Sequence, residues 1–124
     1  MSDAPTKRIL IAEDEHAMGH ALELKLIHEG FDAKLASNGE MALEMMKSEK
    51  FDILLLDIIM PKMNGFQVLE EIKKQNLPIT IIMLSNLSQG EDEKKARDLG
   101  AKDFFIKSNT PLADIVTRVK AALT

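Results

Sequence analysis

Ile53-Leu54-Leu55-Leu56-Asp57 is a run of four large apolar residues that ends in a carboxylate. A strand with one face in water alternates apolar and polar residues, so a short continuous run is typical of a strand covered on both faces. The run from Ile79 to Leu84 has the same character, and its β-branched residues favour an extended backbone. The two runs therefore predict central strands of a parallel sheet.

Three more short apolar runs complete the pattern: Ile9 to Ala12, Ala33 to Ala36, and Phe104 to Ile106. Segments with helical spacing alternate with the five runs. They are Glu15 to His28, Gly39 to Lys47, Phe66 to Lys74, Ser88 to Leu99, and a last helix with Pro111 in its first turn behind a Thr110 cap. This alternation predicts an α/β fold with right-handed crossovers and helices on both faces of the sheet.

Local signals predict where the first helix ends and where the second helix begins. Asn38 is the expected N-cap of the second helix, and Gly30 supplies a left-handed residue after the first. Four side chains of the second helix should face the core: Met41, Ala42, Met45 and Met46. The buried stripe of the last helix should be Leu112, Ile115, Val116, Val119 and Leu123.

The length of 124 residues suits one domain, which we expect to span 1–124 with 1–6 as a loose N-terminal tail. The net charge of −4 offers no basic field for direct nucleic-acid binding. The absence of cysteine excludes disulfides, thiolate metal sites and a cysteine nucleophile. No secretory signal or membrane-spanning run is present, so a cytoplasmic protein without membrane contact is the simplest interpretation.

Polar side chains follow four of the five predicted strands. Glu13 and Asp14 follow the first strand, Asp57 the third, Ser85 the fourth and Lys107 the fifth. In doubly wound sheets the ligand site lies beyond the carboxyl ends of the strands. These five residues are therefore predicted to form one pocket.

The residue types in this pocket indicate phosphoryl chemistry with a magnesium ion. Carboxylates at close range repel one another unless a cation balances them, and Mg²⁺ prefers one or two carboxylates together with phosphoryl oxygens. Asp14 and Asp57 fit that demand, with Glu13 binding directly or through water. Lys107 and Ser85 would contact the equatorial phosphoryl oxygens, which leaves Asp57 as the nucleophile. Asp14 would also suit the cap of the first helix.

The segment Asp57-Ile58-Ile59-Met60-Pro61-Lys62-Met63-Asn64-Gly65 resembles the D-x-x-M-P-x-M-D/N-G motif of response-regulator receiver domains in two-component signalling. The similarity extends over the whole chain and includes Glu13-Asp14, Ser85, Gly100 to Phe104, and Lys107. It implies a flavodoxin-like, doubly wound fold of five strand–helix units with strand order 2-1-3-4-5.

The resemblance also implies a function. A sensor histidine kinase or histidine phosphotransfer protein would transfer a phosphoryl group to Asp57, and the acyl phosphate would later hydrolyse. The chain would then be no enzyme beyond self-phosphorylation from a phosphodonor and autodephosphorylation. The backbone carbonyl of Ile59 would complete the Mg²⁺ ligands, and the backbone of Asn86 would bind the phosphoryl group.

By the same resemblance, Ser85 and Phe104 form a switch that responds to phosphorylation. The helix from Ser88 to Leu99 is the expected moving element, because its charged run leaves few apolar residues to pin it. This helix, the last strand and the last helix would form the face that binds an unknown downstream protein. The domain would be a monomer or a phosphorylation-dependent dimer. Since the chain ends soon after the last helix, its output would come through a bound partner, unless the chain is part of a larger protein.

Three positions depart from the commonest receiver pattern: Glu13 in place of Asp, Asn86 in place of a small residue, and Ser108 in place of a Pro that often has a cis peptide bond. Asn86 and Ser108 leave open an interaction module that signals without phosphorylation. A phosphatase with an aspartyl-phosphate intermediate would need a carboxylate where Ile59 stands. A flavin or dinucleotide site would need a phosphate-binding loop after the first strand, where this chain is acidic.

Overall fold

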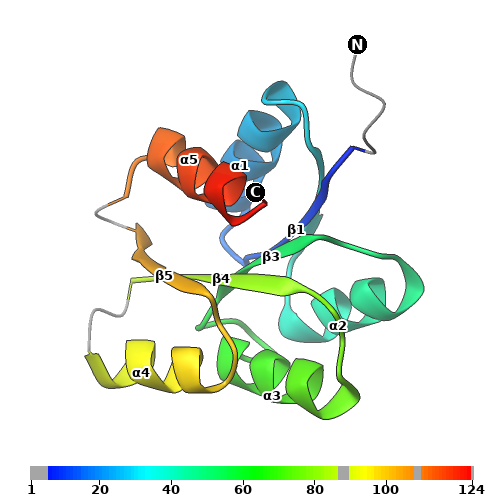
Figure 1. The fold of residues 1–124 in the computed structure, drawn as a ribbon, viewed down its shortest axis with the longest axis vertical. Coiled ribbons are helices and arrows are strands. Elements are labelled where there is room, and N and C mark those ends of the chain that lie inside the picture. Colours follow the sequence, from blue (N-terminus) through cyan, green and yellow to red (C-terminus); the bar gives the residue numbers. More distant parts are fainter. Residues whose placement is uncertain (1–5, 87–89, 108–109, 124) are drawn as a thin grey trace.

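The computed structural model describes residues 6–86, 90–107 and 110–123. Five parallel strands form one sheet in the order β2-β1-β3-β4-β5 (Figure 1). The strands are β1 (Arg8–Ala12), β2 (Asp32–Ala36), β3 (Ile53–Asp57), β4 (Thr80–Ser85) and β5 (Asp103–Ile106). The helices are α1 (His16–His28), α2 (Gly39–Ser48), α3 (Gly65–Gln75), α4 (Gly90–Asp98) and α5 (Leu112–Ala122). The predicted flavodoxin-like fold and strand order are confirmed.

Helices cover both faces of the sheet, with α1 and α5 on one face and α2, α3 and α4 on the other (Figure 1). Residues of β3 point alternately to the two faces, so Ile53 and Leu55 pack toward α1 and α5, while Leu54 and Leu56 pack toward the other layer. All four side chains are fully buried. The continuous apolar run is thus explained by a strand with two dry faces, and each such side chain stabilises the fold by about 1.5–3 kcal/mol.

The helix boundaries agree with the local signals at two positions. The side-chain oxygen of Asn38 accepts a hydrogen bond of 2.8 Å from the backbone N–H of Met41 and caps α2. Gly30 follows α1 with a φ of 97°, the left-handed conformation that glycine adopts at low cost. The predicted start of the fourth helix at Ser88 lies outside the described residues, and the described part of α4 begins at Gly90.

Three local predictions are wrong. Thr110 does not cap α5, because its hydroxyl donates a hydrogen bond of 2.9 Å to the carbonyl of Ile106, and Pro111 is the N-cap without a side-chain bond. Asp14 does not cap α1 either, since Glu15 occupies that position. Met41 is 42% exposed, because α2 turns Ala42 and other side chains toward the sheet instead.

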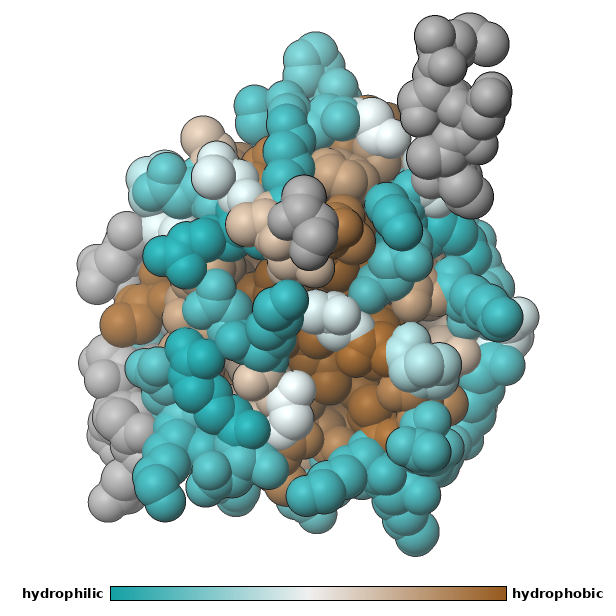
Figure 2. All heavy atoms as spheres, viewed as in Figure 1, coloured by the Kyte–Doolittle hydropathy of each residue, from teal (hydrophilic) through white to brown (hydrophobic). Residues whose placement is uncertain are grey.

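Apolar surface gathers at the edge of the sheet where the strands begin. Figure 2 shows a brown, hollowed area over the start of β4, between α2 and α3. Phe51, Leu77 and Ile79 line the hollow at this edge. The acidic residues that follow β1 and β3 lie at the opposite end of the sheet, where the strands finish.

Candidate functional site

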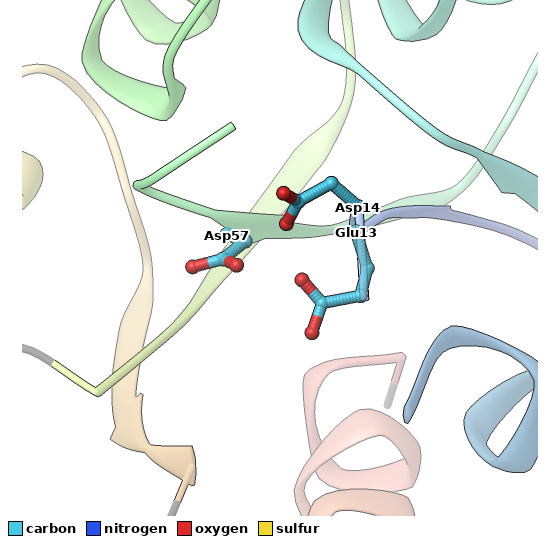
Figure 3. A group of neighbouring side chains, drawn as sticks. All are labelled: Glu13, Asp14 and Asp57. Atoms are coloured by element: carbon cyan, nitrogen blue, oxygen red, sulfur yellow. The ribbon is translucent and has the colours of Figure 1, made fainter. Parts of the chain in front are cut away.

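Three carboxylates converge at the carboxyl edge of the sheet. Glu13 and Asp14 follow β1, and Asp57 is the last residue of β3. Their side chains extend into a shared space (Figure 3), and one oxygen of each lies within 4.8 Å of the others. This arrangement confirms that the two strand ends bring the predicted acidic residues together.

Lys107 brings a positive charge into the same cluster. Its ammonium nitrogen donates a short hydrogen bond to Glu13 Oε1 and lies 3.2 Å from Asp57 Oδ2. The side chains involved are nearly closed to water, with exposed fractions of 8% for Lys107, 4% for Glu13 and 8% for Asp57. Water therefore screens these charges poorly, and each carboxylate depends on the ammonium for its partner.

The burial of the cluster shifts the protonation of its members. Burial and the neighbouring Asp57 carboxylate raise the pKa of Glu13 to about 8, and Lys107 lowers it by less than they raise it. Burial acts to lower the pKa of Lys107, but the hydrogen bond to Glu13 and the charge of Asp57 outweigh it, so this pKa is raised. Without a metal ion, the site thus favours the cationic ammonium and a proton on Glu13.

One atom of the cluster has an unmet need for a partner. Glu13 Oε2 is buried and accepts no hydrogen bond within the part of the chain that the structure describes. A buried carboxylate oxygen without a partner destabilises the protein. One oxygen each of Glu13, Asp14 and Asp57 converge, and together they form a set of hard donors that fits a divalent cation such as Mg²⁺.

The start of α3 holds the backbone of Asp57 in place. Gly65 donates a backbone hydrogen bond of 2.7 Å to the carbonyl of Ile58. A Cβ atom on Gly65 would lie only 2.3 Å from the Asp57 carbonyl oxygen, so no larger residue fits there without moving the backbone. Asn64 and Gln67 form a capping box that fixes this first turn of α3.

The other predicted site residues lie around this cluster. Ser85 ends β4 and is fully buried, and Asn86 follows it with an exposed side chain. The side chain of Ile59, in the loop after β3, is 62% exposed. Phe104 is half-buried against the core layer shared with α2, α3 and α4.

The histidines of α1 do not join the acidic cluster. His16 and His20 stack on each other, with ring centroids 5.9 Å apart, and both are exposed. In the described residues, the cluster of Glu13, Asp14 and Asp57 is the one group of three potential metal ligands with converging atoms.

The family model of the response regulator receiver domain matches residues 9–120. This chain belongs to the response regulator receiver family. Among curated relatives of the receiver, the alkaline phosphatase synthesis transcriptional regulatory protein PhoP of Bacillus subtilis is 35% identical over 94% of this chain and 48% of its own length. The response regulator ArlR of Staphylococcus saprophyticus is 33% identical over 94% of this chain and 52% of its own length. The receiver spans about half the length of these relatives.

Solved structures agree with the family assignment. The response regulator protein TrrA of Thermotoga maritima, in complex with Mg²⁺ and beryllofluoride, matches with a TM-score of 0.83 and 32% identity, over 94% of this chain and 99% of TrrA. A CheY-like receiver domain protein of Methanospirillum hungatei matches with a TM-score of 0.90 and 27% identity, over 96% of this chain and 94% of that one. The curated relatives are named as regulators rather than as conventional enzymes.

None of the described helices has the length and apolar character needed to cross a membrane.

Proposed function

We propose that this receiver accepts a phosphoryl group on Asp57 from a sensor histidine kinase or a histidine phosphotransfer protein. The observation that carries the proposal is the convergence of Asp57 with two further carboxylates and with the ammonium of Lys107 at one edge of the sheet. Membership of the receiver family supports it. So does the likeness to TrrA, which was solved with Mg²⁺ and beryllofluoride.

The acidic cluster is suited to hold Mg²⁺. Glu13, Asp14 and Asp57 would be its side-chain ligands, with Glu13 direct or through water, and the backbone carbonyl of Ile59 would complete the protein's share. The orphaned oxygen of Glu13 supports this assignment, because it lacks any other partner in the described structure. When bound, the ion would offset the negative charge that gathers on the phosphoryl oxygens.

The chain's own residues divide the transfer reaction between them. A carboxylate oxygen of Asp57 forms a bond to phosphorus, while the phosphorus–nitrogen bond of the phosphohistidine breaks and the imidazole leaves with the electron pair. Lys107 is near enough to Asp57 to donate to a phosphoryl oxygen. The Ser85 hydroxyl and the Asn86 backbone N–H supply further donors at the end of β4. Water later cleaves the acyl phosphate, so the chain acts as a switch rather than as an enzyme with turnover.

Phosphorylation then changes the face formed by α4, β5 and α5, through Ser85 and Phe104. The described part of α4 supports this role, because Ala96 is its fully buried apolar residue and much of its remaining contact is polar. Lys95 lies over the ring of Phe66 at 4.4 Å, and Arg97 pairs with Asp103 at 3.6 Å. An element held by such contacts moves at a low free-energy cost.

The changed face would bind a downstream protein or a second copy of the receiver. Lys94 is a suitable probe, since its side chain is 80% exposed and contacts only Asp98 of its own helix among the described ion pairs. Lys94→Glu should weaken partner binding and leave the phosphorylation of Asp57 unchanged. Equal partner binding by Lys94→Glu and the wild type would contradict this assignment of the face.

Intact-protein mass spectrometry tests the phosphoryl-accepting function. The protein is incubated with Mg²⁺ and acetyl phosphate or phosphoramidate, and wild type is compared with Asp57→Asn and with the exposed control Asp98→Asn. The proposal predicts a Mg²⁺-dependent, base-labile adduct in the wild type and in Asp98→Asn but not in Asp57→Asn. Binding of beryllofluoride without an adduct would indicate a slow or short-lived acyl phosphate. Failure of both would favour an interaction module that signals without phosphorylation.

A further inference from the structure

Glu15 places a fourth carboxylate beside the acidic cluster. Its Oε2 lies 4.0 Å from the ammonium nitrogen of Lys107, which is itself 3.2 Å from Asp57 Oδ2. The oxygens of Glu15 and Asp57 are therefore no more than about 7 Å apart, the sum of those two distances. The Glu15 side chain is 62% exposed, whereas the Asp57 side chain is 8% exposed, so Glu15 lies on the solvent side of the cluster.

The position of Glu15 in the helix does not account for its identity. Glu15 is the N-cap residue of α1, yet its side chain makes no capping hydrogen bond. Short side chains such as Ser, Thr, Asp and Asn cap a helix well, and glutamate is not among the preferred residues. The Glu15 carboxylate lies 4.0 Å from the Lys107 ammonium on the exposed side of the cluster, which we take as the entrance for a phosphoryl donor.

The local charge balance makes this entrance unfavourable for anions. Glu13, Glu15 and Asp57 contact the ammonium of Lys107. Asp14 converges with Glu13 and Asp57, so four carboxylates share this part of the described structure. One divalent ion and one ammonium leave the group negative before any phosphoryl group arrives. A donor with a double negative charge meets more repulsion there than a donor that carries its own positive charge.

We propose that Glu15 selects among phosphoryl donors by charge, and this inference rests on the proposed function. Glu15 disfavours small dianionic donors such as acetyl phosphate. It favours donors with a positive group beside the phosphoryl group, as in a protonated phosphoimidazole. The reaction follows one pattern with acetyl phosphate and with phosphoramidate: an oxygen of Asp57 forms a bond to phosphorus, and the bond from phosphorus to the leaving group breaks. Acetate leaves acetyl phosphate with the electron pair, and ammonia leaves phosphoramidate from its protonated nitrogen.

Glu15→Gln tests the inference, because it removes the charge and keeps the size of the side chain. The rate of adduct formation is measured at saturating Mg²⁺ with acetyl phosphate, a dianion, and with phosphoramidate, which carries less net negative charge. We expect Glu15→Gln to raise the acetyl phosphate rate about threefold at low ionic strength and the phosphoramidate rate by less. The gain should shrink toward one at about 0.5 M salt, where charges are screened within a few ångströms.

Glu44→Gln is the matched control. Glu44 lies on the exposed outer side of α2, and the substitution changes the net charge by the same amount. Both rates of this variant should equal those of the wild type. Calorimetric titration with Mg²⁺ serves as a second measurement, and Glu15→Gln should weaken Mg²⁺ binding by about threefold, because the charge that repels a dianion attracts a dication by a similar amount.

The results of these experiments distinguish donor selection by Glu15 from the phosphorylation of Asp57. Equal rate changes with both donors, or no change with either, would overturn selection by Glu15 while the wild-type adduct still supports Asp57 as acceptor. Slower reaction with both donors would also overturn it and would show that Glu15 assists Lys107 or the metal. A wild-type protein without any adduct would contradict the proposed function itself and, with it, this inference.

Discussion

Lys107→Met should destabilise the metal-free protein, because it removes the ammonium that Glu13 and Asp57 share. Methionine keeps a similar apolar stem, so the loss is mainly one of charge. The two carboxylate side chains are 4% and 8% exposed, which prevents water from replacing the ammonium. Removing one partner of a buried ion pair typically lowers the free energy of unfolding by about 3–5 kcal/mol.

We expect the lower end of that range, about 3 kcal/mol, because Glu13 is already protonated below its raised pKa and Asp57 is then the carboxylate left without a cation. Burial already raises the pKa of Glu13 to about 8. The loss of stability should therefore be larger at pH 8 than at pH 6, where the proton is held more firmly. Magnesium should bind Lys107→Met more tightly than the wild type, since the ammonium no longer competes for the same oxygens, and should restore part of the stability.

Urea unfolding followed by circular dichroism measures this loss, since the chain has no Trp or Tyr for fluorescence. The measurement is made with a chelator and then with Mg²⁺, and calorimetry gives the Mg²⁺ affinity. Lys73→Met, on the exposed side of α3, is the control and should change stability by less than about 0.5 kcal/mol. A loss below 1 kcal/mol, or weaker Mg²⁺ binding by Lys107→Met, would refute the description of the site as a buried charge cluster.

Three further substitutions test other parts of the structure. In metal-free protein the folded state keeps a proton on Glu13 up to its pKa of about 8, whereas the unfolded state releases this proton at its ordinary pKa of 4.5. The free energy of unfolding should therefore fall by about 1.4 kcal/mol per pH unit as the pH rises from the lower pKa to the higher one. Glu13→Gln should remove that slope, and parallel pH curves for the two proteins in urea unfolding would argue against it. Gly65→Ala should slow phosphorylation by on the order of tenfold or more, because the backbone of Asp57 must move, and a rate near that of the wild type would contradict the contact. Asn38→Ala should lower the free energy of unfolding by about 1 kcal/mol through loss of the α2 cap, and an unchanged urea midpoint would exclude this.

The fold was predictable from the sequence because its strands are apolar on both faces. A continuous run such as Ile53 to Leu56 leaves few alternatives to a strand between two layers of helices. Side-chain placement on the helices was less predictable. Met41 is apolar and close to the helical stripe, but the sheet contacts its neighbour Ala42, and sequence spacing does not fix the rotation of a helix about its axis.

The N-terminal ends of helices were predictable only where the capping side chain has one suitable hydrogen-bond partner. Asn38 stands directly before α2, and its side chain accepts a hydrogen bond from the first turn of that helix. Thr110 has an alternative hydrogen-bond partner, the carbonyl of Ile106 at the end of β5. A prediction that treats each helix and strand separately does not consider this carbonyl when it assigns the cap of α5. The hydroxyl can reach that carbonyl because Ile106, the last residue of β5, is only four residues earlier in the chain.

The acidic part of the site was predictable from topology alone, because parallel strands finish at one edge. The sequence therefore placed Glu13, Asp14 and Asp57 together, as the structure shows. Two features were missed. The contact of Gly65 with the Asp57 carbonyl and the approach of Glu15 to Lys107 depend on exact loop paths. The one sequence signal for Glu15 was a glutamate at a helix start where a shorter residue would cap better.

The identity of the phosphorylated residue tests the account most directly. Borohydride reduces an acyl phosphate to an alcohol and leaves free carboxylates intact, so a phosphorylated aspartate is converted to homoserine. The protein is treated with acetyl phosphate and Mg²⁺, quenched with borohydride, digested and sequenced by tandem mass spectrometry. We expect homoserine at position 57 and at no other aspartate. Reduction at Asp14, or a protein whose intact mass shows the adduct but whose position 57 is unreduced, would contradict it.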